Sequence, residues 1–247
     1  MRYFLELAFF GKAYHGWQKQ PNAVSVQEVV ENALFKILRT PVPITGAGRT
    51  DTGVHAKQIF AHCDVEEDLA EDFVFKINSV LPVDIAVVNL FRVTDQAHAR
   101  FDALSRSYEY HITGQKDPFS CDRTFYVKRP LNIEMMNRAA AILLQYDEFK
   151  CFSRSRTDVR TYNCKIEQAR WEACNGKMIF HIKADRFLRN MVRAIVGTLI
   201  DIGLEKMKVE KMHEIIMSGN RSEAGASVPA HGLFLTKVEY PKKIFLD

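Results

Sequence analysis

Cysteine is scarce in this chain of 247 residues, and its spacing fits neither a metal site nor a disulfide framework. The five cysteines are an odd number, and no two of them form a C-x-x-C pair. A disulfide framework needs an even set and a structural zinc site needs closely spaced thiols, so both are disfavoured. We interpret all five as reduced, mostly buried thiols: Cys63, Cys121, Cys151, Cys164 and Cys174.

Long hydrophobic runs are also lacking. No uninterrupted apolar run approaches the roughly 18 residues that a membrane-spanning helix needs. The longest candidates, residues 4–10 and 194–202, are interrupted by Glu6 and by Thr198 and Asp201. The N-terminal sequence has an acid at position 6 and no small-residue cleavage site, so it does not read as a signal or transit peptide. We therefore expect a cytoplasmic protein that does not span a membrane.

The sequence signatures of metal and cofactor enzymes are missing too. The eight histidines include no H-E-x-x-H pair, and the G-x-G-x-x-G fingerprint, the phosphate-binding P-loop and the G-x-S-x-G elbow are absent. Chemistry without a metal ion or an organic cofactor is therefore favoured.

The composition is that of a soluble globular protein, with 47% hydrophobic and 26% charged residues. The formal net charge of +4 is compatible with a polyanionic partner. A mildly basic balance is common in ordinary enzymes, so the charge alone decides nothing.

The first part of the chain predicts a β-α-β-β-α-β unit if residues 42–45 count as a strand. Ser25 and Glu28 form a capping box, after which apolar residues repeat at helical spacing up to Leu38. The near-continuous apolar run 85–93 suggests a buried strand. The expected elements are strands over residues 3–10, 59–65 and 85–93, helices over 26–38 and 71–80, and a short strand over 42–45.

The second part mixes strands and helices in a similar order, so the predicted class is α+β. We place the domain boundary in the polar stretch 94–106, giving halves 1–103 and 104–247. Asn175 and Gly176 are a strong two-residue hairpin signal. The expected elements are strands over 108–112, 165–174, 177–184 and 233–240, and helices over 132–144 (capped by Asn132), 187–202 and 209–217.

The most conspicuous local feature is the segment 46–56, with the sequence GAGRTDTGVHA. It groups three glycines around Arg49, Asp51 and His55. Loops of this composition bring the backbone close to a ligand. The structural alternative is a tight turn between strands in which Asp51 forms a hydrogen bond to its own backbone.

Arginines are numerous in the second half. Arg186, Arg189 and Arg193 are spaced to share one face of a helix that follows Asp185. A solvated basic stripe on an amphipathic helix is an equally good interpretation of these three. Guanidinium groups suit phosphates, and the larger set adds Arg49, Arg100, Arg106, Arg154, Arg156 and Arg160. The aromatic residues Tyr14, Trp17, Tyr108 and Tyr110 are candidates for stacking on bases, or for the core.

At residues 48–56, GRTDTGVHA, the chain resembles the tRNA pseudouridine synthase A family, which carries a G-R-T-D-x-G-V-H-A loop. The likeness extends in the same order along nearly the whole chain. The further matching segments are residues 16–21, 99–101, 108–110, 191–197 and 229–233.

This resemblance implies an isomerase that converts uridine to pseudouridine at positions 38, 39 and 40 of the tRNA anticodon stem-loop, without cofactor or metal. It implies the pseudouridine synthase fold: two ferredoxin-like (RRM-like) halves sharing a mainly antiparallel mixed sheet with a central cleft. It also implies a homodimer.

The resemblance assigns roles to individual residues. Asp51 is the nucleophile, Arg193 is its paired cation, and Tyr108 is the ring that packs on the target base. Arg49 is a candidate for occupying the gap left by the flipped base. We further expect Arg186 and Arg189 to contact RNA phosphates.

Two other classes of function compete with this one. The first is a catalytically idle RNA-binding protein on an RRM-like sheet, which has no use for a glycine-framed Arg-Thr-Asp and whose aromatic-rich RNP1 pattern is missing from this chain. The second is a small-molecule hydrolase or transferase that uses Asp51, which predicts activity on nucleosides without RNA.

Overall fold

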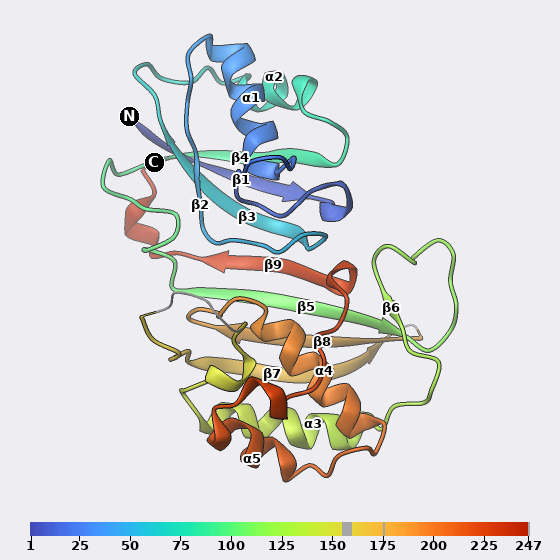
Figure 1. Ribbon diagram of the computed structural model, residues 1–247. Coiled ribbons are helices and arrows are strands. Elements are labelled where there is room, and N and C mark those ends of the chain that lie inside the picture. Colours follow the sequence, from blue (N-terminus) through green and yellow to red (C-terminus); the bar gives the residue numbers. More distant parts are fainter. Residues whose placement is uncertain (155–159, 175, 247) are drawn as a thin grey trace. The chain divides into compact units, whose positions relative to one another are not determined.

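The computed structural model describes residues 1–154, 160–174 and 176–246 (Figure 1). The chain divides into two compact units, of which the second is Ser105–Phe234. The first unit contains Met1–Leu104 and the chain from Leu235 onward. The division expected from the sequence is 1–103 and 104–247, whereas the structure groups the last strand mainly with the N-terminal unit. Both units mix strands with helices, so the predicted α+β class is confirmed.

The first unit is built on a mainly antiparallel sheet with the strand order β4-β1-β3-β9. β1 (Arg2–Phe9) pairs antiparallel with β3 (His55–Asp64) and with β4 (Ile85–Val93). The short β2 (Thr45–Gly46) pairs with β3, and β9 (Leu233–Glu239) lies on the side of β3 away from β1. The predicted strands at residues 3–10, 59–65 and 233–240 are thereby confirmed in type.

Two helices belong to this unit and lie together beside its strands (Figure 1). α1 (Val26–Leu38) begins where predicted, since the Ser25 side chain accepts a hydrogen bond of 3.3 Å from the Glu28 N–H. An N-cap of this kind satisfies a backbone donor that the helix itself leaves open. α2 (Phe73–Val80) buries Phe73 and Ile77.

The prediction that residues 85–93 form a buried strand is wrong in its burial. β4 has these bounds but lies at the end of the strand order. Only Ile85, Val87 and Val93 are buried within it, and Val88 is exposed. An edge strand that packs one face needs alternate apolar residues only, so the extra apolar side chains of β4 face outward.

The second unit has the strand order β5-β8-β7, all antiparallel. β5 (Ser105–Thr113) also pairs in parallel with the two-residue β6 (Phe125–Tyr126). β7 (Ile166–Cys174) and β8 (Lys177–Ala184) form the predicted hairpin. Asn175 lies outside the described residues, and Gly176 has a φ of +74°, which suits a tight hairpin turn.

Three helices complete this unit, and the first of them packs against both others and against β7. They are α3 (Ile133–Ile142), α4 (Met191–Gly203) and α5 (Lys211–Ser218). The Asn132 side chain caps α3 by accepting a hydrogen bond of 3.1 Å from the Met135 N–H. The short 3-10 helices among the described residues are Gly11–Ala13, Leu143–Gln145, Lys150–Phe152, Arg221–Glu223, Ala230–Gly232 and Lys242–Ile244.

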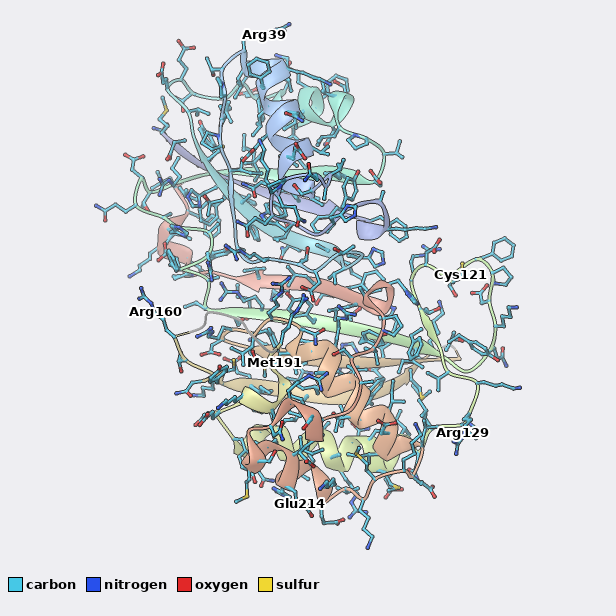
Figure 2. The ribbon with its side chains drawn as sticks, viewed as in Figure 1. Arg39, Cys121, Arg129, Arg160, Met191 and Glu214 are labelled. Atoms are coloured by element: carbon cyan, nitrogen blue, oxygen red, sulfur yellow. The ribbon has the colours of Figure 1, made fainter. Side chains whose placement is uncertain are left out.

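The predicted start of the long helix at residue 187 is wrong. α4 begins at Met191, labelled in Figure 2, after Asn190 in the left-handed conformation with φ of 66°. Arg186 and Arg189 therefore precede the helix and do not share a helical face with Arg193. Apolar spacing misled the prediction, because Leu188 is buried from the preceding loop rather than from a helix. Within the described parts of the chain, no helix is long and apolar enough to cross a membrane.

Candidate active site

The glycine-rich segment 46–56 connects β2 to β3 in the first unit. Asp51 is half-buried near its middle, whereas Arg49 and Thr52 are exposed. The Asp51 carbonyl accepts a hydrogen bond of 3.1 Å from the Val54 N–H, so the chain turns tightly just after the carboxylate. The tight turn that the structural alternative expected is thus present directly after Asp51.

A remote segment holds the backbone on either side of Asp51. The Trp17 N–H donates to the Thr50 carbonyl at 3.3 Å, and the Gly53 N–H donates to the Tyr14 carbonyl at 3.3 Å. These two main-chain bonds bracket Asp51 in sequence. The carboxylate is therefore carried by a backbone whose position depends on residues 14–17.

Two glycines permit this close approach. A Cβ at Gly16, which has a φ of +87°, would lie 2.3 Å from the Thr50 carbonyl oxygen. A Cβ at Gly11 would lie 1.9 Å from the Val54 carbonyl oxygen. No side chain fits at either distance, so only glycine lets the two segments touch.

His55, the first residue of β3, has a structural place in this assembly. It is buried, and its Nδ1 accepts a hydrogen bond of 2.9 Å from the Gly11 N–H. The Phe10 ring stacks on the imidazole with centroids 4.4 Å apart and planes 10° apart. The imidazole thus ties residues 10–11 to the loop rather than facing an open site.

Thr50, next to Asp51, differs from its neighbours in the hydrogen bonding of its side chain. Its Oγ1 is buried with no hydrogen-bond partner in the part of the chain that the structure describes. A buried unpaired hydroxyl costs about 1–3 kcal/mol. Such a cost beside a candidate nucleophile is typical of functional sites, and no sequence signal distinguishes this threonine from Thr52.

The second unit positions Tyr108 on β5, opposite Ile182 of β8. The ring is half-buried and meets the Phe187 ring edge-on, with centroids 5.2 Å apart and planes at 89°. Tyr110 points to the same face of the strand but is fully buried, and its hydroxyl donates to the Pro229 carbonyl at 2.8 Å. Of the two tyrosines expected to stack on bases or to pack in the core, Tyr110 therefore belongs to the core.

Arg193 lies in the first turn of α4 and is half-buried. Its Nε donates to the Val228 carbonyl at 2.8 Å, and the Val228 N–H donates to the Arg193 carbonyl at 3.2 Å. Burial raises the pKa of Tyr110 above its usual range, and the charge of Arg193 acts in the opposite direction. The guanidinium therefore lies close enough to β5 to influence a side chain on the face that carries Tyr108.

A close contact at Gly197 packs residues 225–228, which include the hydrogen-bond partner of Arg193, against α4. A Cβ at Gly197 would lie 1.8 Å from the Ala226 carbonyl oxygen. The Gly225 N–H donates to the Thr198 Oγ1 at 2.9 Å. Val228 lies two residues after Ala226. Its carbonyl reaches Arg193 because the backbones of the helix and of this segment are in contact.

Further arginines gather around residues 185–189. Arg106 Nη1 donates to the Asp185 carbonyl at 2.7 Å, and the Arg186 N–H donates to the Asp185 Oδ1 at 2.6 Å. The Arg154 N–H donates to the Arg189 carbonyl at 3.1 Å. The structure thus brings Arg106 and Arg154 beside Arg186 and Arg189, through chain segments whose proximity the sequence did not indicate.

Besides Arg193, four arginines of the sequence-based set are not in this group. Arg49 and Arg100 are exposed in the first unit. Arg160, labelled in Figure 2, is exposed in the second. Arg156 lies outside the described residues.

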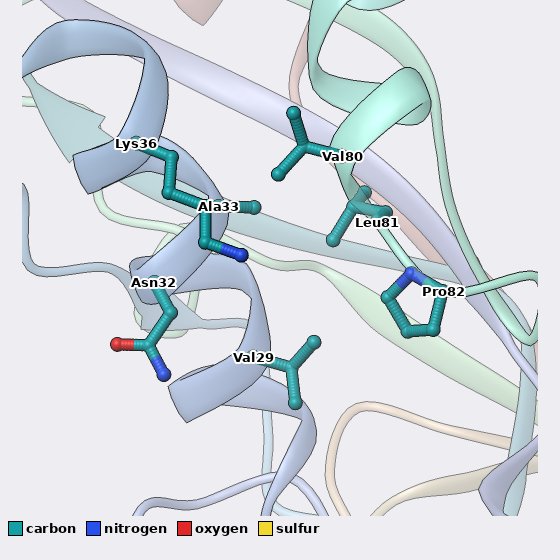
Figure 3. Close-up of a pocket in the computed structure, with 7 residues that line it drawn as sticks. All are labelled: Val29, Asn32, Ala33, Lys36, Val80, Leu81 and Pro82. Atoms are coloured by element: carbon teal, nitrogen blue, oxygen red, sulfur yellow. The ribbon is translucent and has the colours of Figure 1, made fainter.

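A surface pocket between α1 and α2 is separate from these residues (Figure 3). It has a volume of about 300 Å³ and is lined mainly by aliphatic side chains with Lys36 and Asn32 at its border. Its lining residues include no carboxylate, thiol or imidazole. The pocket therefore lacks a carboxylate such as the one that defines the candidate site around Asp51.

The cysteines and potential metal ligands add no second centre. Burial raises the pKa of Cys63, Cys151 and Cys164 to about 12, so these thiols are protonated at neutral pH. Only Cys121 and Cys174 of the five cysteines are exposed, which agrees with the expectation of free, mostly buried thiols. Among residues 1–154, 160–174 and 176–246, no group of three or more His, Cys, Asp or Glu side chains could hold a metal ion.

Comparison with known proteins decides the family. Residues 139–241 match the family model described as tRNA pseudouridine synthase. The tRNA pseudouridine synthase A of Parabacteroides distasonis is 48% identical over 247 residues, covering 99% of this chain and 98% of that protein. The chain belongs to the tRNA pseudouridine synthase A family.

Two further relatives agree with this result. The tRNA pseudouridine synthase A of Porphyromonas gingivalis is 50% identical over 250 residues, 99% of each chain. The tRNA pseudouridine synthase A 2 of Clostridium perfringens is 38% identical over 239 residues, 96% of this chain and 98% of that protein. The family isomerises uridine to pseudouridine in tRNA, so the chain is an isomerase that acts on tRNA. The resemblance drawn from the sequence motifs is confirmed.

Proposed function

We propose that this isomerase acts on uridines 38, 39 and 40 in the anticodon stem-loop of tRNA, with Asp51 as the nucleophile. The observation that carries the proposal is the half-buried Asp51 carboxylate on a backbone bracketed by hydrogen bonds to Trp17 and Tyr14. A nucleophile gains from such fixation because less orientational freedom has to be removed in the transition state.

The reaction explains why a carboxylate is needed. The bond between uracil N1 and ribose C1′ breaks, the base turns, a new bond joins C5 to C1′, and the proton on C5 is lost while N1 gains one. The carboxylate attacks or stabilises the sugar while the base is detached. An enclosing pocket that holds a flipped nucleotide keeps the uracil from escaping.

Arg193 is proposed as the cation that pairs with Asp51 when tRNA is bound. A neighbouring guanidinium keeps a carboxylate ionised and oriented. The double contact of Arg193 with Val228 supports this role, because one bond fixes its main chain and the other fixes its side chain at Nε.

Tyr108 is proposed to pack on the target base. The edge-on contact with Phe187 limits the rotation of its ring, which lowers the entropic cost of stacking. Its hydroxyl is suited to assist removal of the C5 proton.

Three further arginines are proposed to bind the rest of the substrate. Arg49, on the same loop as Asp51, occupies the gap left by the flipped base. Arg186 and Arg189 contact phosphates, supported by their grouping with Arg106 and Arg154. We also propose a homodimer in the cytoplasm, which light scattering and cell fractionation test directly.

Release of tritium from tRNA carrying 5-tritiated uridine tests the nucleophile. Asp51→Asn keeps the shape of the side chain, so we expect tRNA binding at the wild-type level and no tritium release. Thr52→Ala, a substitution at an exposed position of the same loop, is the matched control. It should keep both tRNA binding and tritium release. Turnover by Asp51→Asn near the wild-type rate would remove Asp51 from the mechanism, and release from free uridine would favour a nucleoside enzyme instead.

The target positions need a separate measurement. In tRNA from a strain that lacks this protein, chemical mapping of pseudouridine is expected to show its loss at positions 38, 39 and 40 and its retention elsewhere. Expression of the wild-type chain restores it, and the Asp51→Asn variant does not. Loss at other positions would reassign the substrate site without affecting the family.

A further inference from the structure

Phe101 is a large aromatic residue on the surface of the first unit. Its side chain is 74% exposed. The guanidinium carbon of the adjacent Arg100 lies 5.7 Å from the centre of its ring. Single exposed phenylalanines are common on protein surfaces, so the role of Phe101 depends on how its ring is held and not on its exposure alone.

The ring is held in place by a compact network around His98. The His98 Nδ1 accepts hydrogen bonds from the Arg100 N–H at 3.1 Å and from the Phe101 N–H at 3.3 Å. The Asp102 carboxylate accepts the His98 N–H at 2.7 Å, and the Asp102 N–H donates to the His98 carbonyl at 3.0 Å. Burial lowers the pKa of His98, which favours the neutral imidazole that accepts at Nδ1.

One face of the Phe101 ring is therefore already occupied. It packs on the His98 imidazole with centroids 4.2 Å apart and planes 34° apart. Beneath it, the Ala99 N–H donates to His62 Nδ1 at 3.1 Å, and the Ala99 carbonyl accepts from the Tyr240 hydroxyl at 2.5 Å. The turn is thus anchored to β3 and to the chain after β9, and this fixes the ring in a position where it remains exposed.

A rigid exposed ring beside a guanidinium is the combination that binds single-stranded nucleic acid. Bases stack on aromatic faces in a sequence-tolerant way, while arginine binds the adjacent phosphate. The substrate of this family is tRNA, a polyanion with unpaired nucleotides. We propose that Arg100 and Phe101 form a stacking platform for an unpaired nucleotide of the tRNA other than the target uridine.

This proposal rests on tRNA being the substrate, and not on the target positions or on the role of Asp51. The platform binds substrate without touching the reacting atoms. Its loss should therefore raise the dissociation constant for tRNA and leave the single-turnover rate at saturating enzyme unchanged.

Filter binding of an unmodified tRNA transcript measures the first effect. Phe101→Ala is expected to weaken binding about 5- to 100-fold, the range found when one base-stacking ring is removed. Phe101→Trp should retain wild-type affinity, and Phe101→Leu should behave like the alanine variant because it is apolar but cannot stack. Arg100→Ala should reduce the slope of log affinity against log salt by about one.

Phe75 provides a matched control. It is 78% exposed in the same unit, on α2, beside a Lys76 that pairs with Asp72 at 2.8 Å. Phe75→Ala should bind tRNA like the wild type. Equal affinities for Phe101→Ala and Phe75→Ala would overturn the proposal.

A second measurement identifies what lies on the ring. Irradiation of the complex with a 5-bromouridine-substituted tRNA should cross-link RNA to the tryptic peptide that contains Phe101, and Phe101→Leu should abolish that cross-link. If Phe101→Ala instead changes the oligomeric state and leaves tRNA affinity intact, the ring contacts a second copy of the chain and the proposal fails. Inactivity of Asp51→Asn is scored separately, so the outcome of this test does not depend on it.

Discussion

Acid should destabilise the first unit through His62. This residue of β3 is 8% exposed, and its Nδ1 accepts the Ala99 N–H at 3.1 Å. Burial lowers its pKa from 6.5 to about 4, with smaller contributions from Arg2 and His98 that Asp64 opposes in part. The native structure therefore holds a neutral imidazole that the unfolded chain would protonate.

The sign and size of the change in the free energy of unfolding follow from the difference between the native and unfolded pKa of His62. Above pH 6.5 the imidazole is neutral in both states, and His62 contributes fully to stability. As the pH falls toward 4, only the unfolded chain gains the proton, so the free energy of unfolding decreases. One pKa unit corresponds to about 1.4 kcal/mol, so the loss is about 2 kcal/mol at pH 5 and about 3 kcal/mol below pH 4.

Urea unfolding at pH 7.5 and pH 5, followed by circular dichroism, measures this loss. In His62→Asn the amide oxygen can still accept the Ala99 N–H but cannot be protonated. The wild type should therefore lose about 2 kcal/mol more than His62→Asn between the two values of pH. His15→Asn, at an exposed histidine, is the control and should follow the wild type. Identical pH dependence of the wild type and His62→Asn would refute the reasoning.

Three further changes test the surroundings of the site. Gly197→Ala places a Cβ 1.8 Å from the Ala226 carbonyl oxygen, so overpacking should cost about 1–3 kcal/mol in thermal unfolding and slow tritium release. Thr50→Val removes a buried hydroxyl that has no partner in the described structure, and urea unfolding should show unchanged or slightly higher stability. The double variant Arg186→Ala and Arg189→Ala should lower the salt dependence of tRNA binding by a slope of about two, whereas superimposable slopes would exclude these arginines from phosphate contact.

Elements with strong local signals could be predicted from the sequence. The first helix begins after Ser25 because the capping interaction lies within three residues of it. The hairpin β7–β8 has a turn signal between two alternating strands. In both cases the residues that fix the structure are neighbours in the chain, which is the condition under which sequence patterns are informative.

The wrong predictions concern features that depend on contacts between distant parts of the chain. The helix expected from residue 187 starts only at Met191, because Asn190 takes a left-handed conformation and Leu188 is buried from a loop. The run 85–93 looked like an interior strand, but its place at the end of the strand order is a property of the whole sheet. Periodicity reports which residues are apolar and not which element buries them.

At the candidate site, too, the sequence predicts which residues carry the chemistry but not which contacts position them. The motif around Asp51 predicts the candidate carboxylate, but not that the backbone of residues 14–17 brackets it. Likewise Arg193 could be named, whereas its attachment to Val228 requires the contact between Gly197 and Ala226. No local pattern encodes either relationship.

Both candidate residues, Asp51 and Arg193, are thus positioned by hydrogen bonds to the main chain of remote segments rather than by side-chain packing alone. Main-chain partners do not depend on which side chain the remote residue carries, provided that the two backbones can approach. The restrictive positions are therefore the glycines at the contacts, such as Gly16 and Gly197, where a Cβ would displace the neighbouring carbonyl. A substitution at either glycine should move a functional residue that it does not touch.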